Sequence, residues 1–306
     1  MSKYATPAAF RSALTAKLGN LARDSKWTMP QLRRQFAYDR LLERLYMLDD
    51  GWVLKGAVAL LARDLGVRGS LDVDVYRAKA ADAAEADLRE AAGRDIKDWF
   101  RFEIGPRRVV SDDSKAVRFP VVAYIGQHEW ERFHFDLVGS DLRMTGEPDD
   151  VPAIAQVDMP ELQQKGYRVY PLVDHVADKV AATFERYGAR QQASTRFRDL
   201  VDLVAIARGA SVDAERATAS LRSEFERRGL ALPPTFEVPD RTLWKAGYAR
   251  EAATSLLTDA ATLDEALAIV RPFLDPLLQG TTRGLWSPED AAWTDVSDDE
   301  GASSPS

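Results

Sequence analysis

Two aspartates separated by one residue are the strongest candidates for chemistry in this chain. Asp72 and Asp74 lie in the sequence SLDVDV at 70–75, where polar and apolar residues alternate as in a half-buried β-strand. Residues i and i+2 of a strand point to the same side, so the two carboxylates would lie together. Adjacent carboxylates repel each other unless a cation lies between them. The pattern therefore fits either a divalent metal site or the solvated acidic face of an edge strand.

The residues around this pair favour a phosphate-binding metal site. Upstream, the sequence WVLKGAVALLARDL at 52–65 predicts a strand, a turn at Gly56 and a helix. A glycine there lets backbone N–H groups approach phosphate oxygens. Ser70 lies two residues before Asp72, so a strand that began at Ser70 would place its hydroxyl on the face of the pair and Leu71 in the core.

A later strand supplies a third carboxylate. In FHFDLV at 133–138, alternation places Phe133, Phe135 and Leu137 on one face and His134 and Asp136 on the other. Phosphoryl transfer with two metal ions uses a carboxylate cluster of this kind. The chain has no cysteine and three histidines, none of them spaced as metal ligands, so carboxylates would bind the metal, which favours Mg²⁺ or Mn²⁺. The histidines are interpreted as structural.

Composition indicates a cytoplasmic globular protein. Of the 306 residues, 45% are hydrophobic, and no apolar run approaches the roughly 20 residues of a membrane span. The N-terminus lacks the apolar block of a signal peptide. The net charge is −7, but six acidic residues and no basic residue follow Arg283. Without those six the chain is close to neutral and can hold a basic patch.

The elements that must position these side chains divide into two parts. Apolar periodicity predicts helices at about 7–23 and 30–48, the strand–glycine–helix unit, a helix at about 79–94, and strands that form an antiparallel meander up to residue 138. From residue 171 onward, five amphipathic helices follow. The expected fold is α+β, with a small mixed or antiparallel sheet flanked by helices and a helical C-terminal half. The expected domains are 1–165, 166–285 and a disordered acidic tail at 286–306.

The order of these motifs resembles the polymerase-β-like nucleotidyltransferase superfamily. Within it, residues 30–205 resemble the AbiEii/AbiGii-type nucleotidyltransferase toxins, which include the MenT-like toxins. The residues that carry the resemblance are Lys55-Gly56-Ala57, Ser70-x-Asp72-x-Asp74, Asp136, Lys179 on a helix, and Arg198-Asp199-Leu200-Val201-Asp202-Leu203. Ala57 departs from the Gly or Ser usual there, so it offers no hydroxyl to a triphosphate.

The resemblance implies a role for each matching residue. Asp72, Asp74 and Asp136 would bind Mg²⁺ or Mn²⁺, and NTP would be the substrate. Lys55, Gly56, Ala57 and Ser70 would line the nucleotide site. Lys179 would bind the β- and γ-phosphates. An ion pair of Arg198 with Asp199 would position Lys179 or the base, which places Arg198 at the nucleotide site and Asp199 among the catalytic residues. Asp202, one helical turn further on, could share the face of Asp199.

The resemblance also implies partners. The acceptor would be RNA, with the tRNA 3′ end favoured, and translation would be blocked. The basic residues available for an RNA backbone are Arg107, Arg108, Arg186, Arg190, Arg196 and Arg198. A cognate antitoxin is expected, and phosphorylation of Ser70 could silence the enzyme. Two alternatives stay open, namely transfer to a small molecule or protein hydroxyl, and a binding module without catalysis. Nothing in the sequence fixes the oligomeric state.

Overall fold

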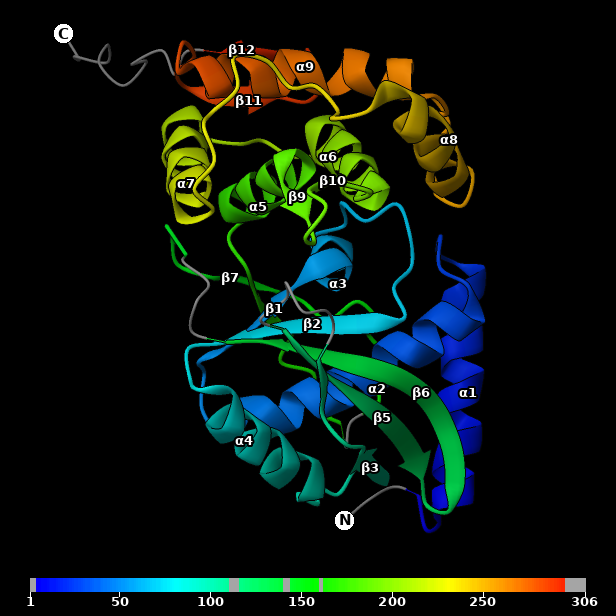
Figure 1. Cartoon of the computed structure of the whole chain (residues 1–306). Helices are drawn as coiled ribbons and strands as arrows, with labels where there is room; N and C mark the ends of the chain where they lie inside the picture. The colour runs from blue at the N-terminus through cyan, green and yellow to red at the C-terminus, as the bar shows by residue number, and fades with distance from the viewer. Residues whose placement is uncertain (1–3, 110–115, 140–143, 160–161, 295–306) are drawn as a thin grey trace, which may run out of the picture. The chain divides into compact units, whose positions relative to one another are not determined.

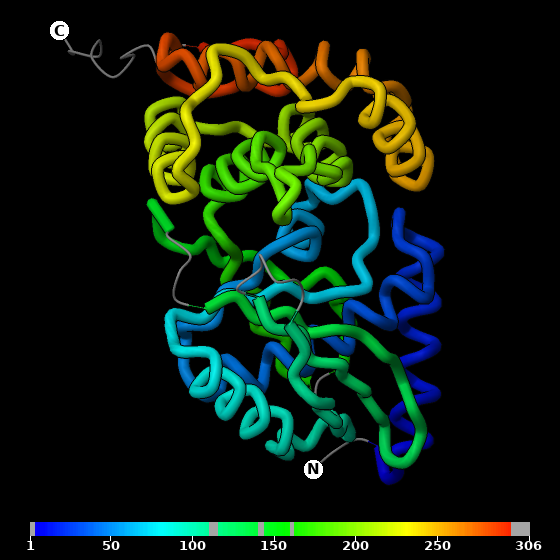
Figure 2. Tube along the Cα trace, viewed as in Figure 1, coloured from blue at the N-terminus to red at the C-terminus, as the bar shows by residue number. Residues whose placement is uncertain are grey.

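The computed structural model describes residues 4–109, 116–139, 144–159 and 162–294 (Figures 1 and 2). The chain forms two compact units. Unit 1 comprises Met1–Arg143 and Glu147–Tyr170, and unit 2 comprises Met144–Gly146 and Pro171–Ser306. The domain division at 165 and 166 stays a prediction.

Unit 1 is built on a mixed sheet. Its described strands are β1 (Trp52–Lys55), β2 (Asp72–Arg77), β3 (Phe100–Ile104), β4 (Arg108–Val109), β5 (Val117–Ile125), β6 (His128–Val138), β7 (Asp149–Val151) and β8 (Tyr167–Val169). Their spatial order is β3-β5-β6-β2-β1-β8-β7, with β4 paired to β5. The pairs β2–β6 and β1–β8 are parallel, and the other pairs are antiparallel. The chain path in Figure 2 shows β5 and β6 joined by a tight turn.

Helices cover both faces of this sheet. They are α1 (Pro7–Arg23), α2 (Met29–Tyr46), α3 (Gly56–Ala62) and α4 (Ala81–Gly93). Figure 1 shows α3 on the side of the sheet opposite α2 and α4. The face toward α2 carries the apolar residues of the strands, and Phe133, Phe135 and Leu137 are all buried there, as their alternation predicted. The opposite face is thereby left to the polar residues.

A buried ion cluster links α2 to the segment before β3. Arg40 and Arg44 of α2 both donate to Asp98, and all three side chains are at most 2% exposed. The two guanidinium groups lower the pKa of the Asp98 carboxyl against the effect of its burial. The cluster fixes α2 beneath the sheet, because leaving any one of these charges buried without its partner would be costly.

Unit 2 is mainly helical. Its described elements are α5 (Leu172–Phe184), β9 (Arg186–Tyr187), β10 (Gln192–Ala193), α6 (Phe197–Gly209), α7 (Ala214–Arg227), α8 (Arg241–Ala252), α9 (Leu263–Gln279), β11 (Leu285–Ser287) and β12 (Ala292–Thr294). The hairpin β11–β12 packs Trp286 and Trp293 against Phe273 of α9. Residues 286–294, which were expected to be disordered, therefore belong to this fold. Residues 295–306 of the predicted tail lie outside the described residues.

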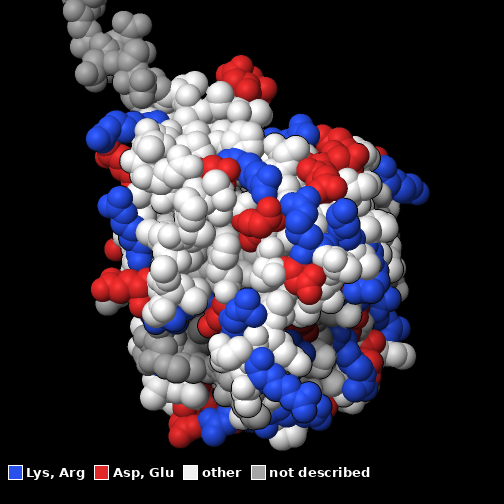
Figure 3. Space-filling model, turned by 45° about the horizontal axis from the view of Figure 1, so that its top comes forward, with Lys and Arg blue, Asp and Glu red and all other residues white. Residues whose placement is uncertain are grey.

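The fold is of the expected class: a mixed sheet flanked by helices, followed by a helical half. The start of β2 differs from the sequence prediction, and β8 was not predicted. β2 begins at Asp72 rather than Ser70, and the side chain of Leu71, expected in the core, is exposed. None of the described helices is long and apolar enough to cross a membrane. On the face drawn in Figure 3, basic and acidic side chains are interspersed.

Candidate active site

One row of paired residues across the sheet of unit 1 carries the charges of the candidate site. Each residue is the direct cross-strand partner of the next, from β1 through β2, β6 and β5 to β4. Directly paired residues share one face of a sheet, so these five side chains lie on the face opposite the apolar core. The residues, in order, are Lys55, Asp74, Asp136, Arg118 and Arg108. Two carboxylates therefore lie side by side, with cations on both flanks.

Asp72 extends this row into a cluster of three carboxylates. It lies two residues before Asp74 on β2, on the same face, and its cross-strand partner is His134. Nδ1 of His134 lies 2.9 Å from Oδ1 of Asp72. The Asp72 side chain is 33% exposed, whereas that of Asp136 is only 9% exposed. The cluster therefore has one carboxylate open to solvent and one nearly closed.

Arg118 holds the buried carboxylate. Its Nε donates to Oδ1 of Asp136 at 2.8 Å and its Nη2 to Oδ2 at 2.6 Å, a bidentate pair. The same Nη2 lies 3.4 Å from Oδ2 of Asp72. These hydrogen bonds to Asp136 raise the pKa of the Arg118 guanidinium. Arg118 thus contacts two of the three carboxylates.

Gly56 lies directly against the cluster. Its φ of +63° belongs to the left-handed region that favours glycine. A Cβ added to Gly56 would lie 1.9 Å from Oδ2 of Asp74, which no real contact permits. A glycine is therefore required where β1 turns into α3, so that the backbone can approach the Asp74 carboxylate. Its neighbours Lys55 and Ala57 are buried, and the Lys55 ammonium lies 4.2 Å from the ring centroid of Tyr170.

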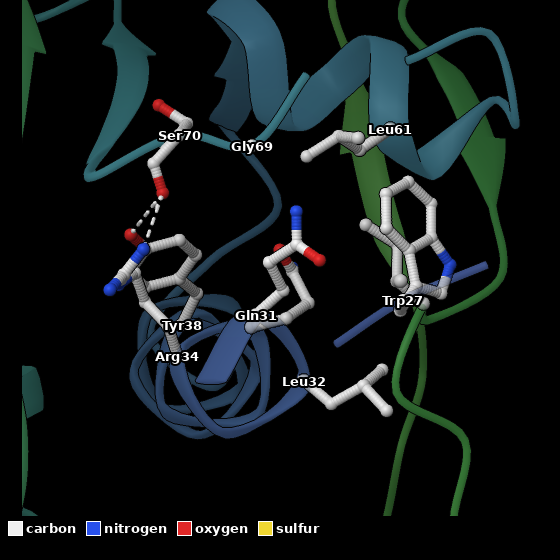
Figure 4. Close-up of a pocket in the computed structure, with 10 residues that line it drawn as sticks. Trp27, Gln31, Leu32, Arg34, Tyr38, Leu61, Gly69 and Ser70 are labelled. Atoms are coloured by element: carbon white, nitrogen blue, oxygen red, sulfur yellow. Dashed lines mark hydrogen bonds between the residues drawn. The ribbon is translucent and has the colours of Figure 1, made fainter. Parts of the chain in front are cut away.

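Ser70 lies next to the cluster but in a different arrangement from that predicted. Its hydroxyl donates to the backbone oxygen of Asp72 at 2.8 Å and accepts from the Asp72 N–H at 3.3 Å. Its carbonyl accepts from Tyr38 Oη at 3.3 Å and Arg34 Nη1 at 3.4 Å, the two bonds drawn in Figure 4. Ser70 thus lies in a turn that fixes the start of β2. The pocket beside it, between Trp27 and Gly69, has a volume of about 20 Å³, room for one water molecule.

The remaining predicted residues lie in unit 2. Lys179 on α5 is buried, and its Nζ donates to Asp199 at 2.9 Å and to Asp202 at 2.7 Å, so both acids of α6 do share one face. Burial alone would raise the pKa of Asp199, but Lys179 and Arg196 lower it to about 2. The predicted pair of Arg198 with Asp199 does not form. Arg196 bonds to Asp199 at 2.6 Å instead, and Arg198, 65% exposed, pairs with Glu251.

Comparisons with known proteins decide the family. A model of the AbiEii nucleotidyl transferase toxins, described as part of a type IV toxin–antitoxin system, matches residues 40–275. The chain belongs to this family. The structure is similar to that of MenT4, a nucleotidyltransferase toxin of Mycobacterium tuberculosis, with a TM-score of 0.50 and 15% identity over 87% of this chain and 98% of MenT4.

Two Helicobacter pylori structures are also similar to this AbiEii protein. JHP933 has a TM-score of 0.48 and 16% identity, over 83% of this chain and 94% of its own. A second structure from the same organism has a TM-score of 0.43 and 15% identity, over 83% of this chain and 96% of its own. No curated protein matches the sequence.

Nucleotidyltransferases of this kind generally use an NTP and a divalent metal, and the residues of this AbiEii chain fit such an ion. Asp72 and Asp74 present hard oxygen donors on one face, and Asp74 is paired with Asp136. Among the described residues no group of three or more acids and histidines is arranged as a complete metal site. Both oxygens of Asp136 are bonded to Arg118. The three carboxylates that could bind the ion are thus present, and the guanidinium group of Arg118 covers the third of them, that of Asp136.

Three residues of the site were not predicted to be part of it. Arg118 and His134 contact the carboxylates, and Arg196 contacts Asp199. For His134 a signal existed, because its alternation with Asp136 put both on one face. For Arg196 a signal also existed, since three residues along a helix separate it from Asp199. Which residue lies opposite Arg118 depends on the register of β5 against β6. The alternation of residues within a single strand does not give that register.

Proposed function

We propose that this AbiEii protein transfers nucleotides from an NTP to a hydroxyl of RNA, with the tRNA 3′ end as acceptor, and so blocks translation. The observation that carries the proposal is the pairing of Asp74 with Asp136 on parallel strands, with Asp72 on the same face. Three carboxylates in this arrangement match what metal-dependent phosphoryl transfer requires. The alternative of a non-catalytic module is less favoured, because such a module would have no need to keep three aspartates together.

In this proposal Asp72 and Asp74 bind Mg²⁺ or Mn²⁺, and Asp136 is the third ligand. When bound, the metal would lower the pKa of the acceptor hydroxyl and neutralise charge on the reacting phosphate. His134 orients the Asp72 carboxylate through their 2.9 Å contact. Gly56 keeps the β1–α3 turn close enough to Asp74 for its backbone to face the phosphates.

Unit 2 contributes Lys179, Asp199 and Arg198 to the proposal. The Lys179 ammonium is shared between two buried carboxylates, so a phosphate that binds it must replace one of them as its partner. Exposed Arg198 is available to an RNA phosphate if it leaves Glu251. Ser70 keeps two proposed roles, as a nucleotide contact and as a site of inhibitory phosphorylation. A phosphate there would break the hydrogen bond from its hydroxyl to the backbone oxygen of Asp72 and add about two negative charges next to the carboxylate cluster.

The choice of RNA as acceptor rests on the family resemblance together with exposed basic residues. Arg108 is exposed at the end of the charged row, and Arg186 and Arg190 lie at the exposed β9–β10 hairpin. RNA binding through phosphate contacts uses side chains of this kind. Cytoplasmic location and a cognate antitoxin belong to the same proposal.

The acceptor can be tested by incubating the purified protein with each labelled NTP, Mg²⁺ and one of three acceptor fractions: total RNA, small metabolites or total protein. The proposal predicts label in tRNA, lost in Asp74→Asn and kept in Asp82→Asn, an exposed acid on α4 that pairs with Arg107. Label in the small-molecule or protein fraction alone would support the alternative acceptors. Label in no fraction would contradict nucleotidyl transfer.

A further inference from the structure

The guanidinium of Arg118 lies against two of the three carboxylates proposed to bind the metal. Its guanidinium takes both oxygens of Asp136 and reaches within 3.4 Å of Asp72, so it neutralises part of a cluster of three like charges. Three carboxylates this close repel each other and favour any cation among them. In the protein without metal, the chain itself supplies that cation.

A bound metal would make the contact of Arg118 with these carboxylates less favourable. A divalent ion held by the same carboxylates would lie within a few ångströms of the guanidinium, and the two cations would repel each other. Asp136 would also have to direct toward the metal an oxygen that now accepts from Arg118. Metal and guanidinium therefore compete for Asp136.

The surroundings of Arg118 favour its release. Its side chain is 30% exposed, so it can move into solvent without crossing the core. Its direct cross-strand partner on β4 is Arg108, whose side chain is exposed on the same face. Like charges directly opposite each other on a sheet are destabilising, so Arg108 destabilises the position in which Arg118 contacts Asp136.

We propose that Arg118 is the counter-ion of the metal-free site and releases Asp136 when the divalent metal binds. The inference rests on the proposed function, because it assigns Asp136 to the metal. It makes Arg118 a positioning residue, which keeps Asp136 in place before the metal arrives and sets the metal concentration at which the site fills.

The test is Mn²⁺ binding to the full-length protein, followed by the electron paramagnetic resonance signal of free Mn²⁺. Arg118→Gln removes the competitor, and Arg118→Lys keeps the charge but loses the bidentate contact. Both are expected to bind Mn²⁺ about tenfold more tightly than the wild type, the equivalent of one charge-assisted hydrogen bond. Arg132→Gln is the matched control, because Arg132 lies on β6 and, among the residues that the structure describes, forms its ion pair with Glu129 at the surface. Near-ultraviolet circular dichroism verifies that each variant is folded.

The outcomes separate the two proposals. If Asp74→Asn abolishes Mn²⁺ binding but both Arg118 variants bind as the wild type does, the competition is overturned and the metal site stands. If only Arg118→Gln binds more tightly, a general change of charge explains the result and the competition is again overturned. If no folded variant binds Mn²⁺, the metal site and the role of Arg118 fall together. In the wild type, the NMR signal of the Arg118 Nε–H should shift on addition of Mg²⁺, and an unchanged signal at saturating metal would contradict release.

Discussion

Arg196 and Arg198, two residues apart at the start of α6, bond to different acids. Arg196 holds Asp199, which also accepts from Lys179, whereas exposed Arg198 holds Glu251. The motif resemblance pointed to Arg198 as the partner of Asp199. The contacts assign that place to Arg196, so at the residue scale the two arginines should differ sharply when they are removed.

We predict that Arg196→Gln lowers the free energy of unfolding by about 1–2 kcal/mol, since it removes a charged hydrogen bond to a buried carboxylate. Arg198→Gln, the matched control, should cost under about 1 kcal/mol. The folded pKa of Asp199 is depressed to about 2, so its stabilising contribution is complete above about pH 4 and is lost as pH falls through about 2. Without Arg196 the folded pKa of Asp199 rises toward its unfolded value, so the carboxylate contributes less stability at neutral pH and less of it is lost as the pH falls.

Urea unfolding of both variants at pH 7 and at pH 2.5 measures these effects. The expected result is a lower midpoint for Arg196→Gln at pH 7, with a smaller deficit at pH 2.5, because protonation of Asp199 removes the interaction that distinguishes the variant from the wild type. A greater loss in Arg198→Gln would show that the resemblance, rather than the contacts, had identified the right arginine.

At the scale of elements, local signals in the sequence located most helices and strands. Thr6 and Pro7 begin α1, and Thr28 forms a capping box with Gln31 at the start of α2, so both helices begin close to where periodicity placed them. Alternation correctly divided β6 into a core face and a polar face. These signals act over a few residues and can be read from one sequence.

The register between strands could not be read in this way. β5 and β6 are joined by a turn at Gly126 and Gln127, and continuous pairing from that turn would set Arg118 opposite Phe135 on the core face. A register shift between Ala123 and Tyr124, of the kind a β-bulge produces, sets it opposite Asp136 instead. A shift of one residue moves a side chain to the other face, so the bulge is what brings Arg118 to the site.

The β1–α3 turn gives a prediction at this scale. Gly56→Ala would add a Cβ that collides with Asp74 at a φ of +63°. We expect a stability cost of about 1–2 kcal/mol for the left-handed conformation. Nucleotide transfer should fall by about 100-fold, because Asp74 must move from its place.

A second glycine provides the control for this variant. Gly19→Ala lies inside α1, where an added Cβ meets nothing within 4 Å. It should keep full activity and gain up to about 1 kcal/mol, because alanine is the better helix former. Thermal unfolding and labelled-nucleotide transfer measure both effects. Full activity in Gly56→Ala would show that the close approach of this turn to Asp74 is not needed.

At the scale of the whole molecule, the chain combines a sheet-based unit with a helical unit, and charged residues of both enter the proposal. The net charge of −7 disfavours RNA on its own, but six of the acids lie after Arg283. Basic and acidic side chains are mixed over the face in Figure 3. Binding of NTP and RNA would therefore depend on local cations rather than on the overall field, and the catalytic step on the carboxylates of unit 1.

The most direct test of the central claim is Mg²⁺-dependent release of pyrophosphate from NTP by the purified protein in the presence of total RNA. Wild type should release pyrophosphate, and Asp72→Asn, Asp74→Asn and Asp136→Asn should each lose release by at least about 100-fold, because each substitution removes a charged metal ligand without changing the shape of the side chain. Asp82→Asn should match the wild type. Release that is undiminished in the folded Asp74→Asn variant would contradict the claim that these paired carboxylates carry the reaction.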